Sequence, residues 1–250
     1  MDILKFNVEV LLKKKYGDDI IFISSPKYFG RNEGYILQFV ARGNLKYNYF
    51  VKLQKLDLKE MLVYKILQNI GIGADDIFFS IVKNKDGIYN LGIASLDVLH
   101  DKPTSSFICG IKEPKHEIDI LVKLVAALFN MNDIPSNIEN WGLIDDSILK
   151  IVDFGISFVY GLTFPILNFN RIEPKIIPKL NKHFPFLFKS HEEFDNILRQ
   201  VMGDVCHFIN SNDDYRNSLS IVESFNYLND LNNFVRLISC NFAVIKNQLQ

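Results

Sequence analysis

The chain divides near residue 97 into a front part with closely spaced strand-like runs and a back part dominated by helical patterns. In the front part, β-branched and aromatic residues concentrate in three short runs separated by turns that contain Gly30, Gly34 and Gly43. These runs are Ile20 to Ser24, Tyr35 to Ala41 and Tyr47 to Leu53. Strands this close together along a chain pair most simply as antiparallel neighbours. We therefore predict an antiparallel meander.

Two helices and a hairpin complete the front part. Apolar residues at helical spacing predict a helix over Ile3 to Tyr16 and a second helix over Asp57 to Ile70, with Asp57 as its cap. The runs Ile77 to Lys83 and Tyr89 to Ala94 flank Asp86-Gly87, which is a strong hairpin signal. All five predicted strands therefore belong to one antiparallel sheet region.

The back part begins with a polar stretch, His100 to Lys115, that is interrupted by prolines and a glycine and is expected to be a connector. A strongly apolar helix is predicted over Glu117 to Asn130. Two further helices are predicted at the C-terminal end, over Glu192 to Asn210 and Ser220 to Leu249. We expect an α+β, bilobal fold, with an antiparallel-sheet domain over residues 1–98 and a mainly helical domain over residues 99–250.

Composition narrows the classes of partner. Hydrophobic residues make up 48% of the 250 residues, which is enough for a large core, and the formal net charge of −1 gives no global basic field for an obligate nucleic-acid partner. No uncharged apolar run reaches the roughly 18 residues of a membrane-spanning helix. The three widely spaced cysteines fit free thiols in a reducing compartment. We expect a cytoplasmic protein, while export into another cell stays open.

Lys52 and Glu60 are the first candidate site residues. Lys52 lies inside the third predicted strand, where it alternates with Val51 and Leu53 and should point to the opposite face. Glu60 lies one turn before Val63 on the inward side of the following helix. The two side chains would form an ion pair and a clamp for phosphate groups. The alternative is an ordinary exposed lysine on a strand.

A loop between the first two predicted strands could cover phosphate groups. Backbone amides of the turn, together with the side chains of Ser24, Ser25 and Lys27, are suitable donors for phosphate oxygens. The stretch contains no G-x-G-x-x-G pattern, and a plain hairpin loop is the alternative interpretation.

Three polar residues in the back part could complete a site for phosphoryl transfer. Asp153 follows the apolar strand Ile148 to Val152 and begins the sequence Asp-Phe-Gly, a position suited to holding Mg²⁺. Asn140 would be a second oxygen ligand for the metal, and Asp133 would face the acceptor hydroxyl. Turn formation is the alternative role for both aspartates.

These residues resemble the motifs of the protein-kinase-like superfamily and, within it, of the compact bacterial HipA-like kinases. The resemblance rests on Tyr49-Phe50-Val51-Lys52, Asn140-Trp141-Gly142 with its upstream Asp133, and Ile151-Val152-Asp153-Phe154-Gly155. It implies a protein-kinase-like fold that binds ATP and Mg²⁺, with Lys52 on the phosphates, Asn140 and Asp153 on the metal, and Asp133 at the acceptor. Ala94 and Leu96, near the expected domain boundary, are assigned to the nucleotide.

The resemblance also implies a protein serine or threonine acceptor, autophosphorylation of a loop serine at the place of Ser24 or Ser25, and a toxin-like enzyme with a neutralising partner protein. The chain departs from the family at Pro135, which stands five residues before Asn140, where the family has its catalytic Asp. No A-P-E sequence follows Gly155. Two alternatives therefore stay open: a pseudokinase that binds nucleotide or a partner without turnover, and a small-molecule kinase.

Overall fold

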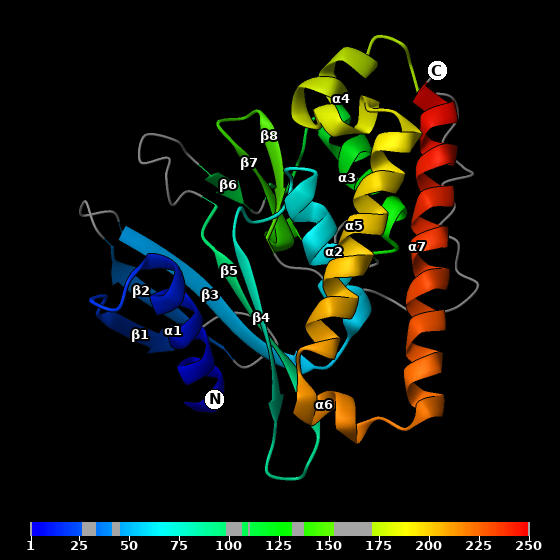
Figure 1. Cartoon of the computed structure of the whole chain (residues 1–250). Coiled ribbons are helices and arrows are strands. Elements are labelled where there is room, and N and C mark those ends of the chain that lie inside the picture. The colour runs from blue at the N-terminus through cyan, green and yellow to red at the C-terminus, as the bar shows by residue number, and fades with distance from the viewer. Residues whose placement is uncertain are drawn as a thin grey trace.

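The computed structural model describes residues 2–26, 34–41, 46–98, 107–109, 111–131, 138–152 and 172–249 (Figure 1). Its main feature is a five-stranded antiparallel sheet with the strand order β1-β2-β3-β5-β4. The strands are β1 (Phe22–Pro26), β2 (Gly34–Val40), β3 (Lys46–Lys55), β4 (Ile77–Lys83) and β5 (Tyr89–Leu96). The predicted meander and the predicted hairpin are both confirmed.

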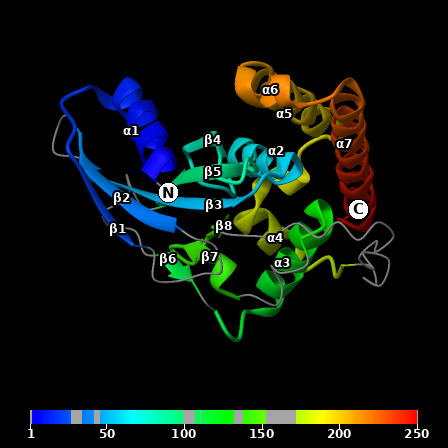
Figure 2. The same ribbon diagram turned by 90° about the horizontal axis from the view of Figure 1, so that it is seen from below.

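Helix α1 (Asp2–Tyr16) covers one face of this sheet (Figure 2). Its buried residues Leu4, Val8 and Leu12 recur every four positions, and they pack on buried side chains of β2, β3 and β5. The approach is close at β5, because a Cβ atom on Gly92 would lie 2.1 Å from Cδ1 of Leu4. Glycine therefore allows the helix to settle on the sheet.

Helix α2 (Leu58–Asn69) follows β3 directly, as predicted, and Asp57 caps it by accepting from the backbone amides of Lys59 and Glu60. The helix ends before Gly71, whose φ of +82° is a conformation that glycine adopts readily. Side chains on most sides of α2 are buried, and they pack against the face of the sheet that α1 leaves uncovered and against helices near the C-terminus.

A second, three-stranded antiparallel sheet has the order β6-β7-β8 and is formed by β6 (Phe107–Cys109), β7 (Trp141–Ile144) and β8 (Ile148–Ile151). The strand β8 was predicted. The connector predicted over residues 100–115 is wrong at β6, and β7 was not predicted. Strands of three or four residues are too short to show an alternating pattern.

Most of the back part is helical, as expected. The helices are α3 (His116–Phe129), α4 (Ile177–His183), α5 (His191–Asn210), α6 (Asp213–Ser218) and α7 (Ile221–Leu249), with short 3-10 turns η1 (Ile138–Asn140) and η3 (Pro185–Phe188). Helices α5 and α7 lie side by side over much of their length (Figure 1). In the described ranges, no helix is both long enough and apolar enough to cross a membrane.

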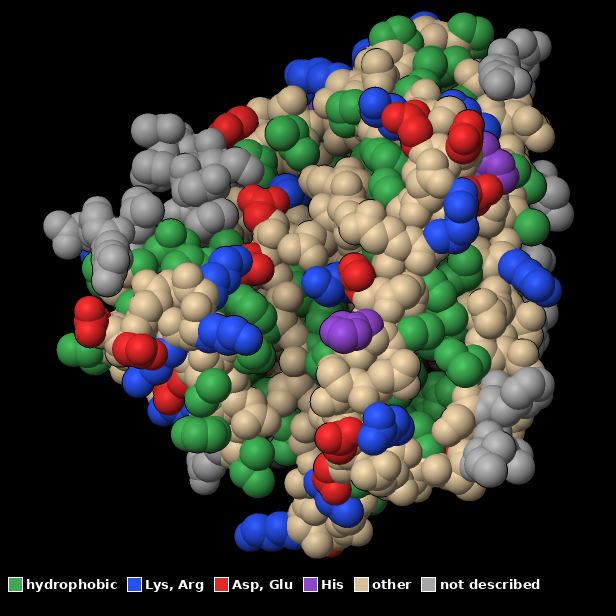
Figure 3. All heavy atoms as spheres, viewed as in Figure 1, with side chains coloured by type: hydrophobic (Ala, Val, Ile, Leu, Met, Phe, Trp, Pro, Cys, Tyr) green, Lys and Arg blue, Asp and Glu red, His purple; other side chains and the backbone are tan. Residues whose placement is uncertain are grey.

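The α+β fold class is confirmed, but the largest apolar core crosses the predicted domain boundary. That core joins α2, β4 and β5 to α3, β7, β8, α5 and α7. A smaller core lies between α1 and the sheet. The bilobal, kinase-like arrangement therefore stays a prediction. On the face seen in Figure 3, Lys and Arg side chains are interspersed with Asp and Glu among the coloured residues.

Candidate functional site

Lys52 and Glu60 form a buried ion pair, as predicted. The Nζ atom of Lys52 lies 3.0 Å from Oε1 of Glu60, and the two residues are only 6% and 8% exposed. Lys52 comes from β3 and Glu60 from the first turn of α2. The direct passage from β3 into α2 brings the two elements together, so that residues eight positions apart meet.

The surroundings of the pair show that burial is its dominant electrostatic feature. Loss of water raises the pKa of the Glu60 carboxyl above its ordinary value, although the charge of Lys52 and hydrogen bonds from Lys52 and Gln54 act in the opposite direction. The ammonium of Lys52 also lies 5.0 Å from the ring centre of Tyr64, a cation–π distance. Lys52 is thus a cation held in a fixed place inside the protein.

The register of the sheet places Lys52 on the face opposite α1. Val51 is buried in the core under α1, and Lys52 pairs across the ladder with Ile93 of β5. Phe50 is two residues before Lys52 and shares its face, yet it is 41% exposed. By the same alternation, Ile23 and Val40 also present exposed apolar side chains on this face. A fixed cation therefore lies on the same sheet face as accessible apolar surface.

Asn140 lies next to the end of β8. Its backbone carbonyl accepts from the amide of Val152 at 2.9 Å, and its neighbour Trp141 pairs with Ile151 across the β7–β8 ladder. Asn140 is 8% exposed. The fold therefore joins Asn140 to Val152, the residue that precedes Asp153 in the sequence.

The two candidate serines diverge. Ser24 pairs with Leu37 and accepts a hydrogen bond from Nζ of Lys5 in α1 at 2.8 Å, so its side chain is on the α1 side of the sheet. Ser25 pairs with Ile36 and therefore belongs to the Lys52 face. Only Ser25 shares a face with Lys52.

Ala94 and Leu96 lie on the α1 side as well. Both are buried in the small core under α1, where Ala94 pairs with Val51 and Leu96 with Tyr49. The structure does not bring their side chains together with Lys52. The residues of β5 that share the Lys52 face are Ile93 and Ser95, because side chains alternate along a strand. The sequence did not identify Ile93 and Ser95, because only the register of β3 with β5 shows which residues of β5 share a face with Lys52.

Three predicted site residues, Lys27, Asp133 and Asp153, lie outside the described residues, as does Pro135. The structure therefore describes the clamp residues Lys52 and Glu60 and one of the two predicted metal ligands. The acceptor side of the predicted site is not among the described residues.

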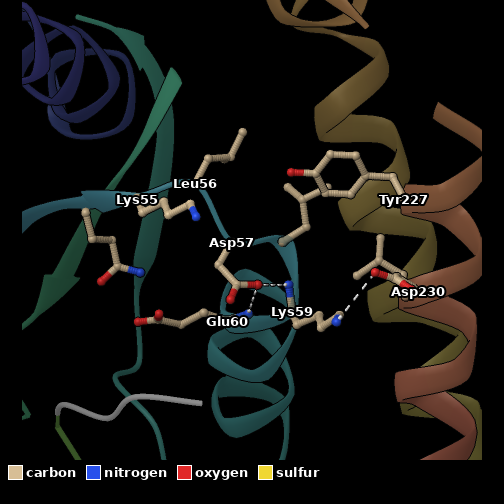
Figure 4. Close-up of a pocket in the computed structure, with 10 residues that line it drawn as sticks. Lys55, Leu56, Asp57, Lys59, Glu60, Tyr227 and Asp230 are labelled. Atoms are coloured by element: carbon tan, nitrogen blue, oxygen red, sulfur yellow. Dashed lines mark hydrogen bonds and ion pairs between the residues drawn. The ribbon is translucent and has the colours of Figure 1, made fainter. Parts of the chain in front are cut away.

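A cavity of about 550 Å³ lies between the β3–α2 junction and α7 (Figure 4). Glu60 is at its edge, and an ion pair of 3.8 Å between Lys59 and Asp230 connects α2 to α7 across it. The other lining residues include Lys55, Asp57 and Tyr227. Its lining mixes both signs of charge, which does not match the excess of donors that a phosphate site needs. The sequence did not predict this cavity.

Of the predicted site features, the described residues confirm the ion pair of Lys52 and Glu60, and they place Asn140 beside β8. The role of Asn140 as a metal ligand stays a prediction. Amide and carboxylate oxygens, such as those of Asn140 and Asp153, are the donor types that Mg²⁺ prefers. A scan of the chain against protein-family models and searches of curated proteins and of solved structures find no match.

Proposed function

We propose that the chain is an ATP- and Mg²⁺-dependent kinase of the HipA-like type that transfers the γ-phosphate to a serine or threonine hydroxyl of a protein. The observation that carries the proposal is the buried pair of Lys52 and Glu60 on the sheet face that α1 does not cover. Phosphoryl transfer depends on positioning and on neutralising charge. A lysine fixed by a carboxylate on one side supplies a positive charge at one place for phosphate oxygens.

The apolar surface beside Lys52 supports a nucleotide as the ligand. Phe50 is on the same face of β3, two residues from Lys52, and retains 41% of its exposure. A flat base gains free energy by covering apolar surface of this kind, while its phosphates reach the cation. One face of the sheet thus offers partners for both ends of ATP.

Asn140 and Asp153 would hold Mg²⁺ in this proposal. The bond between the carbonyl of Asn140 and the amide of Val152 supports it, because Val152 precedes Asp153 by one residue. The ion would neutralise charge on the phosphates when bound. The described part of the protein contributes Asn140 at the end of η1, next to the end of β8.

A pseudokinase is the second candidate, and Pro135 favours it. Proline cannot act as the carboxylate that faces the acceptor hydroxyl, and it stands five residues before Asn140, where the family has an Asp. In the kinase, Asp133 takes this role from two residues further upstream. The neutralising partner protein belongs to the same proposal, since it follows from the resemblance to HipA-like enzymes. We also propose a cytoplasmic location, which rests on the three widely spaced cysteines.

Transfer from radiolabelled ATP with Mg²⁺ tests the proposal. We expect incorporation into protein by the wild type and its loss in Asp133→Ala, in Asp153→Asn and in Lys52→Ala. Lys46→Ala, an exposed lysine at the start of β3, is the matched control for Lys52→Ala and should leave incorporation unchanged. Nucleotide binding without transfer would identify the pseudokinase. Transfer only to small hydroxyl compounds would identify a small-molecule kinase, and activity untouched by Asp153→Asn would overturn the assignment.

A further inference from the structure

A second buried lysine, Lys150 in β8, lies outside the predicted site and is only 3% exposed. Its Nζ atom donates to the backbone carbonyl of Gly73 at 2.9 Å and lies 3.1 Å from Oδ1 of Asp75. Both partners belong to the turn between α2 and β4, which is more than 70 residues away in the sequence. The lysine therefore joins two distant parts of the chain.

The turn that Lys150 contacts is closely bound to α2. The amides of Ile72 and Gly73 both donate to the carbonyl of Leu67, at 3.0 and 2.8 Å. A Cβ atom on Gly73 would lie 2.9 Å from backbone atoms of Leu67 and Gln68, so only glycine fits. The turn is in effect an extension of the helix that carries Glu60.

The same turn holds the end of β8 through the backbone. The amide of Ile151 donates to the carbonyl of Ile72 at 2.7 Å, and the amide of the next residue, Val152, donates to Asn140. Lys150 supplies the side-chain bonds beside these two backbone bonds. A continuous set of hydrogen bonds thus leads from α2, through the turn and β8, to Asn140.

Stability alone does not explain a lysine at this position. Its neighbours Leu149 and Ile151 are buried apolar residues, and an apolar side chain would avoid the desolvation of an ammonium group. A buried charge with specific partners fixes geometry, because its bonds are strong only in one arrangement.

We propose that Lys150 is a positioning residue that fixes α2 relative to the end of β8 and thereby sets the affinity of the site for Mg²⁺–nucleotide. This inference rests on the proposed function, because it assigns Asn140 and the clamp of Lys52 and Glu60 to one site. Lys150 touches neither ligand. It acts through the Gly73 carbonyl and Asp75 on one side and through Ile151 and Val152 on the other.

The test compares Lys150→Met with Lys123→Met, which removes an exposed lysine paired with Asp119 on α3 at 2.6 Å. We expect Lys150→Met to raise the Mg²⁺ concentration for half-saturation of ATP binding by about tenfold, as is typical of residues that orient metal ligands. Its urea midpoint should fall, because the buried Gly73 carbonyl loses its donor, so the Mg²⁺ dependence is measured on folded protein. Lys123→Met should change neither quantity. The side chain of Asp75 is partly exposed, so Asp75→Asn should fold even if Lys150→Met does not. We expect it to raise the Mg²⁺ concentration for half-saturation too, by a smaller factor.

Hydrogen exchange separates failure of this inference from failure of the proposed function. Lys150→Met should speed exchange at the amides of Ile151 and Val152, and Lys123→Met should not. If the wild type binds Mg²⁺–ATP but neither Lys150→Met nor Asp75→Asn changes its Mg²⁺ dependence, the positioning role is wrong and the function stands. If the wild type binds no nucleotide, the proposed function is wrong, and unchanged exchange at Ile151 and Val152 would then reject the coupling as well.

Discussion

The two faces of the five-stranded sheet are formed by the same strands but differ in what covers them. Under α1, Leu4 and Leu12 pack on Leu37, Tyr49 and Val51, and these residues are almost completely buried. On the opposite face, a buried ion pair lies near α2, and exposed apolar side chains such as Phe50 lie further along the strands. The face under α1 is closed by the smaller core. The opposite face is covered by the largest core at β4 and β5, and it combines a costly charge pair with exposed apolar side chains over β1 to β3.

The two faces differ in how much their buried groups contribute to the free energy of unfolding. Burial of the aliphatic and aromatic side chains under α1 lowers the free energy of the folded state. A buried ion pair contributes little or nothing net, because desolvation offsets the attraction of the charges. Stability alone therefore does not explain the Lys52–Glu60 pair, and the proposed function gives a reason for it.

The largest effect is expected from replacing both members of the pair. Lys52→Met/Glu60→Leu should abolish phosphoryl transfer, because no fixed cation remains for the phosphates. The free energy of unfolding should stay the same or rise by about 1 kcal/mol, since apolar residues replace a desolvated pair. Transfer assays and urea unfolding of the same preparation measure both. A double variant that keeps activity would show that the pair is only structural.

The next largest effect is expected on the closed face. Leu4→Ala should lower the free energy of unfolding by about 2–5 kcal/mol, because it leaves a cavity between α1 and Gly92. Phe6→Ala changes an exposed residue of the same helix and should stay within about 0.5 kcal/mol of the wild type. Urea unfolding distinguishes the two. Loss of specific activity in folded Leu4→Ala would contradict the separation of the faces.

A smaller effect is expected at Phe50 on the opposite face. Phe50→Ser should weaken ATP binding by about tenfold, roughly 1.4 kcal/mol, through loss of apolar contact with the base. Its unfolding free energy should fall by about 1–2 kcal/mol, because more than half of the Phe50 side chain is buried. Ile3→Ser, an exposed apolar residue on α1, is the control. Calorimetric titration with Mg²⁺–ATP measures the affinity, and equal affinities for all three proteins would reject Phe50 as a contact.

The smallest effect concerns pH. Burial raises the pKa of Glu60 in the folded protein above its ordinary value of 4.5, so the folded state holds this proton more tightly than the unfolded state. The resulting stability is fully present below pH 4.5 and is lost as the pH rises through the folded pKa. The Lys52→Met/Glu60→Leu variant lacks this dependence, whereas Asp57, which also has a raised pKa, titrates in both proteins. Between pH 4 and pH 7, the free energy of unfolding of the wild type should therefore fall more with rising pH than that of the double variant. Parallel pH profiles of the two proteins would contradict this expectation.

Local patterns were enough to predict the elements around the candidate site. The cap at Asp57, the Asp-Gly hairpin and the alternation of Val51, Lys52 and Leu53 each depend on residues close together in the sequence. The meeting of Lys52 with Glu60 was predictable for the same reason, because a strand leads directly into a helix. The proposal that these residues bind ATP goes further and depends on the resemblance to kinases.

Other features could not be predicted because they depend on pairing between distant segments. Ala94 and Leu96 were assigned to the nucleotide, but the register of β3 with β5 puts them under α1 and puts Ile93 beside Lys52. The partners of Lys150 lie on a turn more than 70 residues away. No local pattern distinguishes Lys150 from an exposed lysine on a strand.

Propensity, capping and periodicity act over a few residues, so the longer helices and strands and the residues suited to charge-based chemistry could be predicted from the sequence. Packing between remote segments settled which face of the sheet each residue occupies, how α2 is fixed against β8 and the C-terminal helices, and that the main core crosses the predicted boundary. The physical reason is that register and burial arise from packing between segments that are remote in the chain, where one residue of shift exchanges the two faces of a strand.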